Sequence, residues 1–366
     1  MTVRKKPSEK IKTIRPSGKR EENFFALVFE VARQIPKGRV TSYYIEKLQS
    51  SNALTPYMLE DIFPYNKTEN LEFETIFSSE HYPVSATFTG FDGGGKLMGR
   101  DGLSKFVEEL RPIKITRALG GKLLTLWAQT KADQLLINPL FDDIKAVYDG
   151  VRIRTERMRA EVMQTGKLEI NENGVKFAVD YEVPESHKVI HDGSVNKYWS
   201  NAESNPLDDM NKWLNDLSFT PEYAIISPAL KRYILTNSNV KQAIYGTDKK
   251  EQILSWNEFQ NYLTIKGLPP MFVYNYKYRD IDSNSEVTIW QDKKFVWATG
   301  NLGYTHMGPT IEEILAENVV RVENGTCIVV YKDSTLKSSG IYTTASATAL
   351  TTLNAKNDLF IADLLA

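Results

Sequence analysis

The stretch that most resembles a catalytic motif is rich in glycine. Residues 90–97 have the sequence GFDGGGKL, which matches the Gly-x4-Gly-Lys part of a phosphate-binding loop. Such a loop needs a Ser or Thr after the lysine to hold Mg²⁺, and a helix whose first amides face the phosphate. Leu97 occupies the hydroxyl position, and Gly99 and Gly102 interrupt the expected helix. The stretch therefore does not predict a nucleotide site.

Histidine and cysteine give no pattern typical of a metal site or a nucleophile. The four histidines are His81, His187, His191 and His306. Only His187 and His191 have i, i+4 spacing, and their segment, 184–193, contains a proline, a glycine and no third ligand, so we expect an ordinary loop there. Cys327 begins the apolar run CIVV and is expected to be a buried structural thiol. A single cysteine excludes a disulfide scaffold, which fits folding in a reducing cytoplasm.

Acidic and aromatic residues also have structural explanations. Pairs of adjacent carboxylates occur at Asp142-Asp143, Asp208-Asp209 and Glu312-Glu313. Each pair is expected in the first turns of a helix, where negative charge complements the helix dipole. Tyr274, Tyr276 and Tyr278 have strand spacing, which favours one packed face of a β-ribbon over a base-stacking platform. The sequence thus predicts no catalytic residue, no cofactor-binding residue and no metal ligand, and we expect the protein not to be an enzyme.

Composition and charge are those of a folded chain with a basic N-terminus. A length of 366 residues is enough for two linked domains, and a composition of 42% hydrophobic and 25% charged residues is that of a folded protein. No window approaches the roughly 18 apolar residues of a membrane helix, and no signal-peptide core is present, so neither membrane insertion nor secretion is expected. Residues 1–20 contain eight Lys or Arg and one acid, giving this tail +7 and the remainder −8. Such a tail predicts salt-sensitive contact with nucleic acid that reads no sequence.

A long amphipathic helix is the clearest predicted element. Asn138-Pro139 is typical of a helix start, and apolar residues follow at three- and four-residue steps until Gly166. The opposite face is charged and contains Arg152, Arg154, Glu156, Arg157, Arg159 and Glu161. The pairs Arg152 with Glu156 and Arg157 with Glu161 have i, i+4 spacing. We expect this face to be solvated or to contact another subunit.

The other predicted elements indicate an α+β chain with one domain inserted into another. Two β-hairpins are expected, at 167–181 with the turn Asn173-Gly174 and at 319–331 with the turn Asn324-Gly325. Residues 105–118, after the glycine-rich stretch, are expected to belong to a flexible β-loop that projects from the body. The last segment, 354–366, is apolar enough to be docked.

Residues 24–43 resemble the opening helix and turn of the DNA-binding half of the alkylguanine-DNA alkyltransferases and alkyltransferase-like proteins. The shared stretch, IPKGRVTSY, ends at Tyr43. The Pro-Cys-His-Arg acceptor motif of that family is missing, and Cys327 has neither the distance nor the neighbours to replace it. No alkyl transfer is expected. A DNA-binding or DNA-repair-associated alkyltransferase-like protein remains the alternative hypothesis.

Residues from about 44 to 366 resemble the phage lambda major head protein family, which adopts the capsid fold of phage Hong Kong 97. The similar stretches are Ile62-Phe63-Pro64, 154–161, Gly166-Lys167-Leu168, 205–209 followed by 224–227, and 359–366. The resemblance implies a basic tail and N-terminal arm at 1–70 and an extended β-loop at 84–118. It further implies a peripheral domain, with a long spine helix, at 119–185 and 319–366, and an inserted axial domain at 186–318.

The same resemblance implies a structural function. The chain would be the major capsid protein of a tailed bacteriophage, made in the cytoplasm of the bacterial host and located in the virion. Pentamers and hexamers of the chain would form the icosahedral head that encloses the genome. Scaffold, decoration and portal proteins are the further partners that the resemblance suggests, together with packaged double-stranded DNA held by non-specific contact.

Overall fold

The computed structural model describes residues 57–77, 104–119, 121–130, 134–194, 196–247, 252–315, 319–333 and 340–366. The basic tail, the alkyltransferase-like stretch 24–43, His81 and the glycine-rich stretch 90–97 lie outside these residues. Within the described part of the chain, no helix has the length and apolar character needed to cross a membrane.

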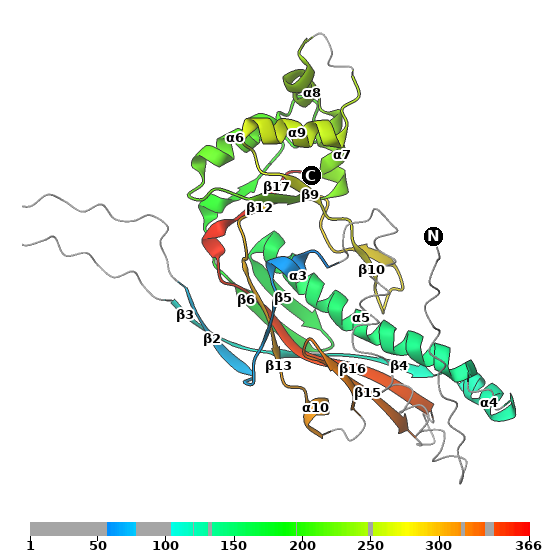
Figure 1. Cartoon of the computed structure of the whole chain (residues 1–366). Coiled ribbons are helices and arrows are strands. Elements are labelled where there is room, and N and C mark those ends of the chain that lie inside the picture. The colour runs from blue at the N-terminus through cyan, green and yellow to red at the C-terminus, as the bar shows by residue number, and fades with distance from the viewer. Residues whose placement is uncertain are drawn as a thin grey trace, which may run out of the picture.

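A single long helix, α5 (Gln134–Thr165), runs along one sheet and ends near a second (Figure 1). It follows a shorter helix, α4 (Gly121–Thr130). The expected start at Asn138-Pro139 was wrong, because the helix begins at Gln134. Pro139 is thus the sixth residue of α5, and near the N-terminus it removes only one intrahelical hydrogen bond.

The sheet beneath α5 has six strands in the order β1-β13-β16-β15-β14, with β4 also paired to β16. Their bounds are β1 Tyr65–Lys67, β4 Arg111–Leu119, β13 Gly303–Gly308, β14 Val319–Glu323, β15 Thr326–Asp333 and β16 Gly340–Leu353. Ile115 contacts Gly150 of α5, and its cross-strand partner Ala345 lies on the same face. Ala347 and Ala349 continue that face of β16. Small side chains at these positions let the helix lie close to the sheet.

Strand β4 differs from the expectation for residues 105–118. Residues 104–109 form β3, which pairs with β2 (Glu72–Phe77). Residues 111–119 do not project as a loop; they pair with β16 from Ala349 opposite Arg111 to Ile341 opposite Leu119. The physical reason is that Ile113 and Ile115 alternate with polar residues, which gives β4 an apolar face to bury under α5.

The second sheet has five strands in the order β7-β17-β12-β8-β9. These are β7 Lys188–Ile190, β8 Tyr223–Ile226, β9 Met271–Val273, β12 Lys294–Ala298 and β17 Leu359–Asp363. Four helices lie next to this sheet, namely α6 Pro206–Asp216, α7 Pro228–Thr236, α8 Ser238–Tyr245 and α9 Trp256–Lys266 (Figure 1). Strand β17 lies inside the sheet, between β7 and β12, so the expectation that the last segment is docked is confirmed.

Both predicted Asn-Gly hairpins are confirmed. Strands β5 (Lys167–Glu172) and β6 (Val175–Asp180) turn at Asn173 and Gly174, which have φ of 50° and 80°. Strands β14 and β15 turn in the same way, with φ of 48° at Asn324 and 70° at Gly325. Positive φ at both central residues is what this hairpin turn requires. The remaining short elements are α3 Leu59–Ile62, η1 Glu185–His187, β10 Lys277–Arg279, β11 Glu286–Thr288, α10 Ile311–Leu315 and η3 Lys356–Asp358.

Cys327 lies in β15 and is fully buried, as expected. Burial raises the pKa of its thiol to about 11. We therefore predict that Ellman's reagent labels Cys327 at pH 8 only after denaturation. Because the unfolded thiol ionises at lower pH than the folded one, Cys327 should also make the free energy of unfolding fall as pH rises from 9 to 11. Labelling of the native protein as fast as of the denatured protein would contradict this.

Candidate functional site

The charged residues of α5 between 152 and 161 lie against other parts of the chain, so the expectation of a solvated face was wrong. Glu156 and Arg159 are fully buried and form an ion pair of 3.2 Å at i, i+3 spacing. The expected i, i+4 partners are replaced by distant ones. Arg152 pairs with Glu60 at 2.7 Å, and Arg157 pairs with Glu172 at 3.3 Å.

The buried pair joins four segments of the chain. The Oε1 atom of Glu156 accepts hydrogen bonds from the Leu59 backbone amide at 3.2 Å and from the Tyr274 hydroxyl at 2.8 Å. Arg159 donates from Nε to Thr305 Oγ1 of β13 at 2.9 Å. Its guanidinium also lies 4.5 Å from the centre of the Tyr65 ring. Four parts of the chain thus meet at one polar junction, namely segment 57–67, helix α5, the residues before β10 and strand β13.

Burial has the largest effect on the pKa values of the groups at this junction. Burial raises the pKa of Glu156, while the charge of Arg159 and the hydrogen bonds from Tyr274 and Leu59 oppose that rise. Burial, together with the carboxylate of Glu156, also raises the pKa of Tyr274. The tyrosine therefore stays a hydrogen-bond donor, which the carboxylate requires.

One stripe of α5 contacts segment 57–67. It consists of three charged residues with i, i+4 and i+7 spacing, which are Arg152, Glu156 and Arg159. Arg152 lies 3.7 Å from the centre of the Tyr57 ring in addition to its pair with Glu60. Sequence reasoning missed this stripe because its spacing also suits a solvated face.

The interpretation of the three spaced tyrosines as packed residues is confirmed. Tyr274 is buried, and the ring of Tyr276 lies 5.8 Å from that of Tyr57. Tyr278 lies under the guanidinium of Arg157 at 4.6 Å. All three therefore pack on or near α5. The three tyrosines do not share one strand, however, because β9 ends at Val273 and β10 starts at Lys277.

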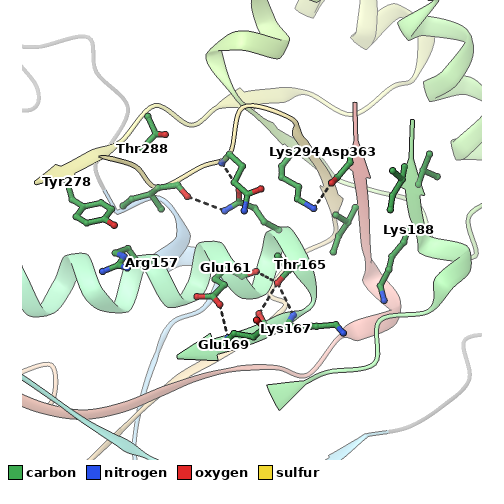
Figure 2. A pocket seen from close by; sticks show the side chains of 16 residues that line it. Arg157, Glu161, Thr165, Lys167, Glu169, Lys188, Tyr278, Thr288, Lys294 and Asp363 are labelled. Atoms are coloured by element: carbon green, nitrogen blue, oxygen red, sulfur yellow. Dashed lines mark hydrogen bonds and ion pairs between the residues drawn. The ribbon is translucent and has the colours of Figure 1, made fainter. Parts of the chain in front are cut away.

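A groove of about 570 Å³ lies where the end of α5 meets the five-stranded sheet. Figure 2 shows side chains from α5, β5, β7 and β17 around it. Its lysines are paired with carboxylates: Lys294 with Asp363 at 2.5 Å, Lys167 with Asp180 at 2.7 Å, and Lys188 with Glu185 at 2.7 Å. Because each lysine already has a partner, the groove lacks the concentrated charge that would hold a small anion.

Gln164 connects α5 to the chain that leads into β12. Its buried side-chain amide donates to the carbonyls of Ala160 at 2.9 Å and Ile289 at 3.3 Å, and it accepts from the Gln291 amide at 2.7 Å. We predict that Gln164→Met lowers the free energy of unfolding by about 1–3 kcal/mol, because the buried Ile289 carbonyl and the part-buried Gln291 amide lose their partner. Urea denaturation would measure this loss. A change of under about 0.5 kcal/mol would contradict it.

The three histidines of the described residues, His187, His191 and His306, contact other parts of the chain and do not form a cluster. His187 Nδ1 lies 3.2 Å from the Leu359 carbonyl, and His191 Nδ1 lies 2.8 Å from that of Lys197. His306 contacts the Thr352 hydroxyl at 3.1 Å, and burial lowers its pKa. Among the described residues, no three His, Cys, Asp or Glu side chains are placed to share a metal ion.

Two of the three carboxylate pairs lie where they were expected. Asp208-Asp209 and Glu312-Glu313 are in the first turns of α6 and α10. Asp142-Asp143 is not in a first turn, because α5 begins at Gln134. Asp143 instead is buried and pairs with Arg117 of β4 at 2.9 Å, and burial raises its pKa. It ties the helix to the sheet.

Comparison with known proteins identifies the fold. The solved structure of a protein assigned as the capsid protein of a prophage of E. coli CFT073 matches with a TM-score of 0.57 and 12% identity, over 89% of this chain and 99% of that one. A phage-related protein from Bordetella bronchiseptica RB50 matches with a TM-score of 0.52 and 11% identity, over 92% and 96%. The predicted α+β fold of the Hong Kong 97 type is therefore confirmed.

Sequence comparison gives the family. No curated protein matches the sequence of the chain. The family described as phage major capsid protein E matches residues 44–363, which is nearly the whole chain and includes both sheets and α5. The chain therefore belongs to the phage major capsid protein E family, and its function is to form a capsid.

Proposed function

We propose that this chain is the major capsid protein of a tailed bacteriophage and assembles as pentamers and hexamers into an icosahedral head. The observation that carries the proposal is the family match over residues 44–363. Assembly would take place in the host cytoplasm, which the single, buried cysteine suits. The chain would act without catalysis, since the charges of α5 and of the groove hold segments of the chain together.

The proposed domains are a tail and arm at 1–70, an extended loop within 84–118 that ends before strand β4 (Arg111–Leu119), a peripheral domain at 119–185 and 319–366, and an axial domain at 186–318. The described residues contain two hydrophobic clusters, which supports a division into two main bodies. The first includes side chains of α5 and β16, the second includes side chains of α6, α7 and α9, and β12 contributes to both. Two strands cross the proposed bounds, because β13 lies in the sheet with β16 and β17 lies in the five-stranded sheet. The loop would return to the peripheral domain through β4, which is anchored on β16.

Sedimentation velocity of the purified chain tests self-assembly. We expect pentamers, hexamers or larger particles at moderate protein concentration, without added nucleic acid. A single species at the 41.7 kDa of the chain at all concentrations would contradict the proposal. The DNA-repair alternative predicts that monomer, together with a mobility shift of duplex DNA at low salt. It is not supported, because the family that matches residues 44–363 is a family of phage capsid proteins.

Scaffold, decoration and portal proteins are proposed partners, and the basic tail is proposed to contact packaged DNA without reading bases. The support for the DNA contact is the charge of +7 in residues 1–20. Deleting residues 2–20 should leave shell assembly intact and reduce DNA packaging. Unchanged packaging after this deletion would remove the proposed role of the tail.

A further inference from the structure

Among the described residues, strand β9 is an outermost strand of the five-stranded sheet, and its three residues, Met271 to Val273, are all apolar. An outermost strand exposes N–H and C=O groups that can pair with a strand of another molecule, and charged side chains or proline oppose such pairing. The other outermost strands of the two large sheets each contain a charged residue, namely Lys67 in β1, Lys114 in β4, Lys188 in β7 and Arg321 in β14. Strand β9 therefore lacks the usual protection.

The backbone groups of β9 face alternately toward β8 and away from it. The Pro270 carbonyl and the Tyr274 amide each form a hydrogen bond of 2.9 Å to β8. Phe272 lies midway between these two residues and faces β8 in the same way. Met271 and Val273 alternate with them, so their N–H and C=O groups are directed to the free edge of the sheet.

One side chain of helix α9 occupies this free edge at Met271. The Nε2 atom of Gln260 donates to the Met271 carbonyl at 2.5 Å, and its Oε1 atom accepts from the Met271 amide at 3.2 Å. A neighbouring antiparallel strand would form the same two bonds, one in each direction, with a residue in this position. The amide group of Gln260 thus takes the place of a further strand.

The end of α9 brings Gln260 to this position. Gly267 ends the helix with a φ of 72°, and the Leu268 amide donates to the Leu263 carbonyl at 2.9 Å. This turn reverses the chain, so that β9 returns beside the helix it follows. Phe259 and Leu263 of α9 are buried in the same hydrophobic cluster as Met271. Gln260, which follows Phe259 in the helix, therefore reaches the edge of the strand.

The residues before Met271 also limit pairing at this edge. Pro269 and Pro270 have no N–H group to donate to another strand. Phe272 is directed to β8, and the backbone of Met271 is bound by Gln260. Within 269–273, only Val273 has an N–H group that faces the free edge and is blocked neither by proline nor by Gln260. One substitution at position 260 would therefore double the number of such groups.

We propose that Gln260 prevents strand pairing between copies of the chain by blocking the free edge of β9. Phe272, which is 41% exposed, would add apolar contact to such a pairing. The inference does not require the proposed function, because strand pairing at an open apolar edge threatens any folded chain. It would matter more in a chain whose copies assemble, since assembly brings many identical edges close together.

Two substitutions in the full-length chain separate blocking of the edge from stability. Gln260→Met keeps nearly the same side-chain length and removes both hydrogen bonds to Met271. Gln260→Glu removes the donor to the Met271 carbonyl but places a charge at the same edge. Both variants should exchange the amide hydrogens of the peptide that contains Met271 about fivefold faster or more, because a hydrogen bond is lost. Unchanged exchange in both would contradict the role of Gln260 at this edge.

Thioflavin T fluorescence, which reports stacked intermolecular strands, then measures pairing between copies below the Tm of each variant. We expect Gln260→Met to form thioflavin-positive aggregates about tenfold faster than the wild type, and Gln260→Glu to form them no faster than the wild type, because its charge opposes pairing. The matched control is Gln242→Met on α8, which adds the same apolar side chain at an exposed position away from β9 and should behave as the wild type.

Three outcomes would overturn the inference. Aggregation of Gln260→Glu as fast as that of Gln260→Met would show that lost stability, and not an open edge, is the cause. Equal aggregation of Gln242→Met would show that any added apolar side chain is sufficient. Wild-type behaviour of Gln260→Met would show that the edge of β9 needs no protection.

Discussion

Replacing Arg159 by methionine is expected to lower the free energy of unfolding by about 3–5 kcal/mol, the usual result of removing one partner of a buried ion pair. Methionine fills much of the space but leaves Glu156 without its cation. It also removes the hydrogen bond to Thr305 and the contact with the Tyr65 ring. Urea denaturation at pH 8, followed by tryptophan fluorescence, would measure the loss.

The pH dependence of this variant separates charge from packing. The pKa of Glu156 is already raised by burial, and loss of Arg159 raises it further. A carboxyl whose pKa is higher in the folded state stabilises the fold as pH falls below that pKa. The destabilisation caused by Arg159→Met should therefore be smaller at pH 5.5 than at pH 8.

A second substitution provides the control. Glu156→Gln in the Arg159→Met background removes the unpaired charge and keeps an oxygen that can accept from Leu59 and Tyr274. This double variant should be more stable at pH 8 than Arg159→Met alone. A loss that is independent of both pH and the glutamine substitution would show that the pair acts only through packing.

Replacing Trp213 by alanine should cost about 3–5 kcal/mol, which is typical of large-to-small changes in a core. Trp213 lies at the centre of the aromatic cluster beside the five-stranded sheet. Its ring lies 6.1 Å from Trp199, 6.0 Å from Trp297 and 5.2 Å from Phe360. Alanine leaves a cavity that these rings can close only by leaving their own contacts.

The matched control for Trp213→Ala is Trp256→Ala, at the start of α9. Trp256 is only partly buried and contacts Phe259 and Lys231. Its removal should cost clearly less than that of Trp213. Thermal unfolding followed by near-ultraviolet circular dichroism would compare the two. Equal losses would contradict the assignment of Trp213 to the centre of the core.

Much of the fold could be predicted from local patterns. The turn at Asn173-Gly174 requires positive φ, so residue types alone indicated the hairpin. The apolar spacing of α5 predicted its helix, and the apolar end of the chain predicted docking of β17. Each of these depends on residues that are close together in the sequence.

The polar junction could not be predicted in the same way, because its contacts are long-range. Glu156 meets Tyr274 across 118 positions and Leu59 across 97. At its spacing, Glu156 is equally compatible with a solvated i, i+4 pair, and only the fold brings its partners near. The same reasoning applies to β4, whose alternating residues allowed either a loop or a strand until β16 supplied a partner. Likewise, the pair Glu312-Glu313 indicated the start of a helix at α10 but not the side of it that faces outward.

Negative-stain electron microscopy of the purified full-length chain tests capsid formation most directly. We predict closed shells, or rings of five and six subunits, in preparations without added nucleic acid. Uniform particles of single-subunit size at every protein concentration, with binding to duplex DNA as the only measurable activity, would contradict it.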